Sequence, residues 1–63
     1  MKHYLVMMCD PEGMPRAWAT APTLTDAKRA ARKHLNVYRG EKAQTRDPLA
    51  HAGYTEVVEV VEG

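Results

Sequence analysis

The chain has 63 residues, with nine Lys and Arg against eight Asp and Glu, three His and one Cys, and its formal net charge is +1. A chain of this length predicts one small domain over residues 1–63, which buries only about 60% of the surface of its unfolded form. The single cysteine excludes an intramolecular disulfide, and no apolar run approaches the ~20 residues of a membrane span. We therefore expect a cytoplasmic protein.

The first third of the chain predicts a β-hairpin. Residues His3–Cys9, HYLVMMC, are apolar on both alternating faces, which is typical of a central strand. The following DPEG suits a type I turn in which Gly13 adopts a positive φ. Residues Pro15–Ala21, PRAWATA, alternate with a period of two and are bracketed by prolines, which indicates an edge strand.

The segment TLTDAKRAARKHLN, Thr23 to Asn36, changes to the helical period. Thr23 and Asp26 resemble a capping box at its start, and Gly40 is a typical stop after its end. At about 100° per residue the helix is amphipathic. The mostly apolar side carries Leu24, Ala27, Ala30, Ala31, His34, Leu35 and Tyr38. The polar side carries Lys28, Arg29, Arg32, Lys33 and Asn36.

The last third predicts a loop, a short turn and a strand. EKAQTR, residues 41–46, shows no period, and DPLAHAG predicts one helical turn with Asp47 as its cap and Gly53 at its end. YTEVVEVVE, residues 54–62, predicts a strand because its valines are β-branched. A helix is the alternative for this segment, because some of its apolar residues also match a helical face: Tyr54, Val57, Val58 and Val61.

The order strand, strand, helix, strand predicts an α+β fold. A helical crossover places the third strand parallel to the second and beside the first, so we expect a three-stranded antiparallel sheet of order 2-1-3 with the amphipathic helix packed on one face. The other face would be apolar, and monomers rarely expose such a patch. We expect a partner or a second copy, in a homodimer, to cover it; the alternative is that the segment from Val37 to Gly53 folds over it.

No residue pattern predicts catalysis or metal binding. The chain has no Ser, and a Cys–His pair would need a pocket that so short a chain scarcely builds beside a core. The candidate metal ligands lack ligand spacing, and they are His3, Cys9, His34 and His51. Glycine-rich phosphate loops are also missing from the sequence. We therefore expect a protein that is not an enzyme and takes no cofactor or metal.

Positive charge is concentrated in the middle of the chain, since seven of the nine Lys and Arg lie between Lys28 and Arg46. A basic helix face can dock on an acidic protein surface, bind phosphates, or be merely solvated, with the Lys and Arg stems covering the alanines beneath. The near-neutral total charge and the lack of aromatic residues on the helix face favour protein over nucleic acid. The predicted partner-binding residues are Lys28, Arg29, Arg32, Lys33, Arg39 and Lys42.

The helix start TLTDAKRAA, Thr23 to Ala31, resembles the "sLtxAKRxA" helix of some small phage-encoded anti-CRISPR proteins, which follows a short sheet and precedes a further strand. It is also similar, at Thr23, Asp26 and Ala27, to the "T-x-E-E-A-x-x-N-A" helix of HicB-type antitoxins, although the chain lacks their "PDLPG" stretch and DNA-binding tail. The first resemblance implies a phage or mobile-element protein in the bacterial cytoplasm that inhibits a host defence protein or nucleoprotein complex by binding. The second implies an antitoxin-like regulator that binds nucleic acid.

Overall fold

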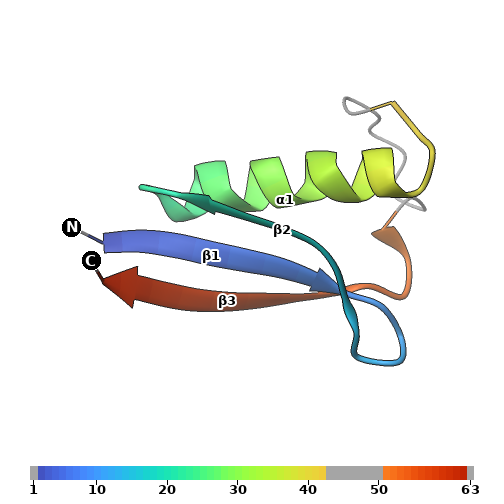
Figure 1. Cartoon of the computed structure of the whole chain (residues 1–63), viewed down its shortest axis with the longest axis horizontal. Helices are drawn as coiled ribbons and strands as arrows, with labels where there is room; N and C mark the ends of the chain where they lie inside the picture. The colour runs from blue at the N-terminus through green and yellow to red at the C-terminus, as the bar shows by residue number, and fades with distance from the viewer. Residues whose placement is uncertain (1, 43–50, 63) are drawn as a thin grey trace.

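The computed structural model describes residues 2–42 and 51–62, which form a three-stranded antiparallel sheet with one helix on one face (Figure 1). The elements are β1 (Lys2–Cys9), β2 (Pro15–Ala21), α1 (Leu24–Tyr38) and β3 (Thr55–Glu62), and the sheet order is β2-β1-β3. The predicted α+β fold, the strand order and the strand conformation of the last segment are confirmed. The loop predicted at residues 41–46 and the turn predicted at 47–53 lie largely outside the described residues.

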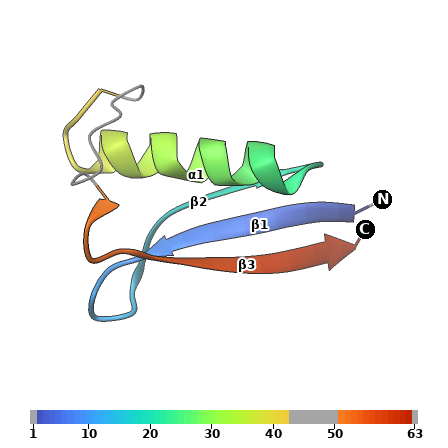
Figure 2. The same cartoon turned by 180° about the vertical axis from the view of Figure 1, so that it is seen from behind.

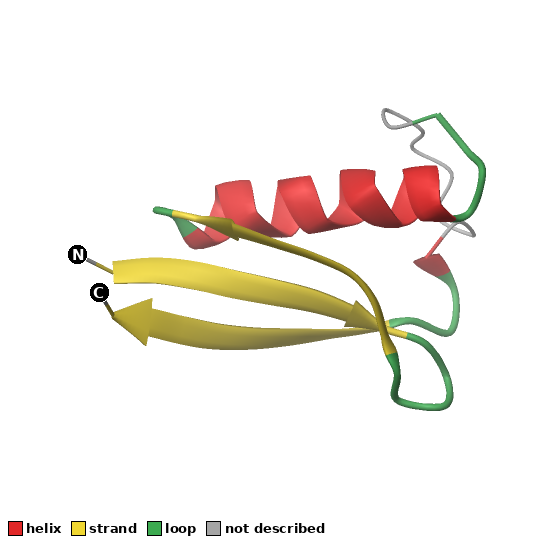
Figure 3. Cartoon of the chain, in the orientation of Figure 1, coloured by secondary structure: helices red, strands yellow, loops and turns green. Residues whose placement is uncertain are grey.

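The turn between β1 and β2 has the predicted geometry. The Gly13 amide donates to the carbonyl of Asp10 at 2.9 Å, and Gly13 has a φ of 87°, a value that glycine adopts without strain. The strand register shifts between Met8 and Cys9, which is where a bulge adds twist. Figure 3 shows this turn at the end of the sheet farthest from the two chain termini.

Both ends of α1 follow from local chemistry. The hydroxyl of Thr23 accepts from the amide of Asp26 at 3.2 Å, which satisfies one of the four free N–H groups of the first turn. At the other end Gly40 has a φ of 81° and donates to Val37, and the Glu41 amide donates to Asn36 at 2.8 Å. These two bonds form a Schellman motif, so the predicted helix stop is confirmed.

The core lies between α1 and the sheet and is built largely from small side chains. Val6 faces α1, and its strand neighbours are Ala19 and Val58. Small residues on both layers allow the helix backbone to approach the sheet closely. The buried apolar residues are Val6, Met8, Ala17, Ala19, Ala27, Ala31 and Leu35.

Three residues of α1 depart from the predicted amphipathic division, and one of them is His34, which was placed on the apolar side but is exposed. Asn36, placed on the solvated side by its position on the helix, is only 2% exposed. Its side-chain oxygen lies 2.8 Å from Nε2 of His51, so its burial is accompanied by a hydrogen bond. Tyr38 was placed on the apolar side, but it is exposed at the C-terminal end of α1.

The helix is off-centre on the sheet. Among the described residues, α1 packs against β2 and β1 rather than β3, and both views show β2 nearest to the helix and β3 farthest from it (Figures 1 and 2). Val58 and Val60 of β3 are consequently 42% and 54% exposed, although their strand positions face the helix layer. Within residues 2–42 and 51–62, the β3 edge of the sheet therefore has no helix over it.

Candidate functional site

The four bases of α1 divide into two pairs with different surroundings. Lys28 and Arg32 lie on the side of the helix nearer β3 and meet the carboxylate of Glu56. Nη2 and Nε of Arg32 lie 2.8 and 2.9 Å from Oε1 of Glu56, and Nζ of Lys28 lies 4.0 Å from Oε2. Half of the predicted basic face is therefore engaged with an acidic side chain of the protein itself.

This contact links the helix to the strand that it does not cover. Glu56 is about three-quarters buried, whereas Lys28 and Arg32 remain substantially exposed. Ion pairs at such a surface contribute about 0–1 kcal/mol each, so we regard the cluster as a positioning contact rather than a main source of stability. Arg32 and Glu56 are 24 residues apart, and no local signal in the sequence indicates that they meet.

Arg29 and Lys33 face away from the sheet. They are four residues apart on α1, which places their Cβ atoms about 6 Å from each other on one helix face. Nη1 of Arg29 lies 3.8 Å from Oδ1 of Asp26, but both side chains are more than half exposed. Lys33 is exposed as well. We call Arg29 and Lys33 the outer basic pair.

The remaining two predicted contact residues lie beyond the last turn of α1. Arg39 is its C-cap, and the guanidinium carbon lies 5.7 Å from the ring centroid of Tyr54, a cation–π distance. Lys42 is exposed in the following segment. The six residues are thus spread along the helix and its C-terminal end, and the outer basic pair is the part that is exposed on the helix face away from the sheet.

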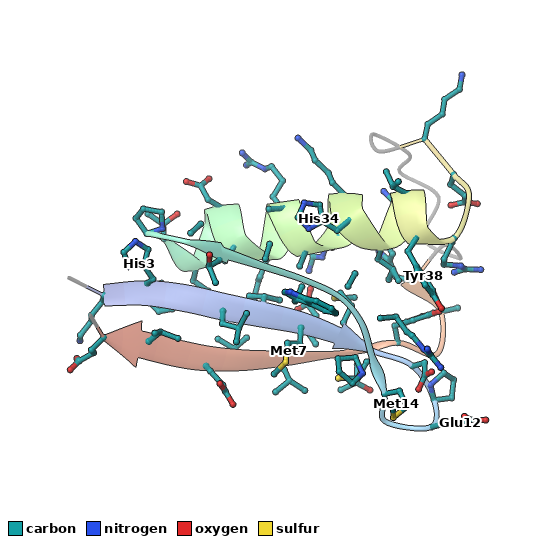
Figure 4. The ribbon with its side chains drawn as sticks, in the orientation of Figure 1. His3, Met7, Glu12, Met14, His34 and Tyr38 are labelled. Atoms are coloured by element: carbon teal, nitrogen blue, oxygen red, sulfur yellow. The ribbon has the colours of Figure 1, made fainter. Side chains whose placement is uncertain are left out.

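The predicted uncovered sheet face is present, and we call it the open sheet face. Among the described residues, no helix packs on this side of the sheet. Trp18 is 58% exposed there and pairs with Met7, whose side chain projects away from α1 (Figure 4). The apolar residues of this face are Leu5, Met7, Cys9, Trp18, Val57 and Val61. The basic helix surface and the only tryptophan therefore lie on opposite sides of the molecule.

The described histidines on α1 and near β3 have structural contacts. Nδ1 of His34 lies 2.8 Å from the backbone oxygen of Trp18, on the side of α1 that meets β2 (Figure 4), and His51 contacts Asn36 as described above. Across residues 2–42 and 51–62, no three His, Cys, Asp or Glu side chains come together as a metal site would require. The same residues contain no helix with the length and apolar character to cross a membrane.

Comparison of the chain with protein-family models, with curated proteins and with solved structures found no match.

Proposed function

We propose that the protein acts by binding, without turnover, and that it inhibits an acidic partner protein or nucleoprotein complex through the outer face of α1. The observation that carries this proposal is the division of the helix bases. Glu56 holds Lys28 and Arg32, whereas Arg29 and Lys33 are exposed on the outer face of α1. Two cationic side chains whose Cβ atoms lie about 6 Å apart on one helix face suit a pair of carboxylates on a partner surface.

Arg39 and Lys42 extend this surface at the C-terminal end of the helix. Lys28 and Arg32 would form its edge, because their side chains remain substantially exposed while paired with Glu56. The predicted contact set is therefore kept, with Arg29 and Lys33 at its centre. The resemblance of residues 23–31 to the anti-CRISPR helix makes a phage-encoded inhibitor of a bacterial defence complex the first specific form of the proposal to test.

Binding to nucleic acid is the second candidate, because the same cations would contact phosphates. Two features favour a protein partner over it. Glu56 neutralises part of the positive charge beside the outer basic pair. Trp18, the largest stacking side chain, lies on the opposite side of the molecule from that pair, so a strand of nucleic acid bound by the pair would have no indole to stack on.

The test is charge reversal of the outer basic pair. The variant R29E/K33E should keep the fold, because neither side chain is in the core, and should lose at least about tenfold in affinity for the partner, equivalent to about 1.4 kcal/mol. The partner is obtained by capture from bacterial lysate on the tagged wild-type chain, and its affinity is then measured by titration calorimetry. The matched control is T25A, an exposed change on the same helix.

Arg32 is a poor choice for this test, since reversing it would set two carboxylates against each other at Glu56. If R29E/K33E binds the captured partner as tightly as T25A does, the proposed surface is wrong. Titration of the chain with generic duplex DNA and RNA at decreasing salt tests the second candidate, binding to nucleic acid. Binding that strengthens steeply at low salt and disappears in R29E/K33E would replace the protein partner with a nucleic acid.

A further inference from the structure

In the part of the chain that the structure describes, the outer edge of β3 is unpaired and carries apolar side chains on both faces. β3 is the last strand in the order β2-β1-β3, so within the described residues one row of its backbone N–H and C=O groups has no neighbouring strand. Its four valines are all substantially exposed, Val58 and Val60 toward the helix layer and Val57 and Val61 on the open sheet face. Such an edge is a template for pairing with another strand.

We propose that two copies of this chain pair through β3, antiparallel about a two-fold axis that passes beside Val58 and runs perpendicular to the sheet. A symmetric contact of this kind uses the same surface on both copies and closes on itself. The axis keeps directly opposite residues on the same face of the sheet. Each register of such a pair is therefore defined by the β3 residue that lies opposite the same residue of the second copy.

The three glutamates of β3 distinguish between these registers. A register centred on Glu59 would set Glu59 against itself and Glu56 against Glu62, and like charges directly opposite are destabilising. A register centred on Val58 sets Glu59 opposite Val57 and Glu56 opposite Val60, so no acid faces another. Registers centred on Val57 or Val60 also avoid acid pairs, but they pair residues 55–59 or 58–62 alone, whereas the Val58 register pairs 55–61.

The charges around β3 also fit the Val58 register. Glu62 of the second copy is level with Tyr54, and the guanidinium of Arg39 lies over the Tyr54 ring. Val60 of the second copy is opposite Glu56, whose charge is already met by Lys28 and Arg32. Arg39 thus lies near the position that Glu62 of the second copy reaches, while Lys28 and Arg32 already offset the charge of Glu56 within each copy.

The resulting assembly is one continuous six-stranded sheet. Both copies of α1 lie on the same face of it, because the axis is perpendicular to the sheet, and the exposed pair Val58 and Val60 from each copy lies between the two helices. The off-centre position of α1 leaves room for this arrangement. The outer basic pair remains exposed on each copy, so the inference does not depend on the proposed function.

The test is disulfide trapping in a C9S background. In the Val58 register the Cα atoms of the two Val58 residues are about 4.5–5.5 Å apart, a separation that a disulfide spans. The two Glu59 residues are diagonal neighbours about 7–8 Å apart. V58C should therefore form a covalent dimer on mild oxidation, and the matched variant E59C should form at least about tenfold less, as measured on non-reducing gels.

Sedimentation velocity provides the second measurement. The unmodified chain should sediment as a dimer. V58K should sediment as a monomer, because it places two ammonium groups opposite each other at the axis, and its circular dichroism spectrum should show that it is folded. V37K, an exposed change on α1, should remain dimeric. The inference is overturned by preferential trapping of E59C, by a native monomer with no trapping of V58C, or by a dimer that W18S abolishes and V58K leaves intact. The last of these results would assign the contact to the open sheet face.

Discussion

Asp10 organises the turn between β1 and β2 through its side chain. Its Oδ1 accepts from the amides of Glu12 and Met14 at 3.0 and 2.9 Å, and its Oδ2 accepts from Nε of Arg16 at 2.8 Å. The hydrogen bond from Arg16, followed by that from the Met14 amide, holds the pKa of Asp10 below its usual value of 3.8, and the same contact raises the pKa of Arg16. The ionised carboxylate is thus the form that the folded turn selects.

This contact predicts a pH dependence of stability. Because the pKa of Asp10 is lower in the folded chain than in the unfolded chain, its contribution is fully present above pH 3.8 and is lost as the pH falls through the lowered pKa. D10N should be less stable than the wild type above pH 3.8, and the difference in urea midpoint should shrink below that pH. The control is E12Q, an exposed change in the same turn. A difference for D10N that stays constant across this range would contradict the assignment.

At the scale of elements, the position of α1 follows from where small residues occur. Ala17 and Ala19 of β2 and Ala27 and Ala31 of α1 belong to one buried cluster. Alanines on both layers let the helix settle close to β2, where backbone atoms rather than long side chains set the separation. β3 carries valines and glutamates instead, and its link to the helix is made by the long side chains of Lys28 and Arg32.

The end of α1 provides a prediction for this element. Gly40 has a φ of 81°, and a Cβ built on it would meet no atom within 4 Å, so replacement would be opposed by backbone conformation rather than by a steric clash. G40A should lower the free energy of unfolding by about 1 kcal/mol, the usual penalty for a side chain in the left-handed region. Urea unfolding of G40A, with T25A as the control variant, measures this loss of free energy of unfolding. Equal stability of the two variants would show that the Schellman motif is not important for holding the helix end.

At the scale of the whole molecule, stability depends on very few large side chains. Leu35 and Val6 are the largest fully buried residues. A chain of this length has a free energy of unfolding of roughly 3–9 kcal/mol, and truncating a buried leucine to alanine costs about 2–5 kcal/mol. The core therefore has little reserve against the loss of either residue.

L35A is accordingly expected to be largely unfolded at room temperature, as measured by circular dichroism and thermal melting. V37A is the matched control, because Val37 is on the same helix but 59% exposed, and it should melt close to the wild type. A cooperative melt of L35A near that of V37A would mean that the core between helix and sheet is not the main source of stability.

The fold was predictable from the sequence because its signals are local. DPEG, the Thr23–Asp26 pair and Gly40 each specify a turn or a helix end through neighbouring atoms, and the crossover rule then fixes the strand order. The candidate site was predicted only as a set of residues, without their arrangement. The division of the helix bases into two pairs depends on the contact of Arg32 with Glu56, and the burial of Asn36 depends on its contact with His51. Both contacts join residues that are far apart in the sequence. Single-sequence periodicity carries no information on such pairs.

Lys2 of β1 pairs with Glu62 of β3, so the two ends of the described chain lie side by side (Figure 1). Paired residues of neighbouring strands are about 5 Å apart, a gap that a short peptide linker spans. Head-to-tail cyclisation is therefore compatible with this fold and would reduce the conformational entropy of the unfolded chain. For a domain with so small a core, cyclisation would therefore add to the free energy of unfolding without any new packing contact.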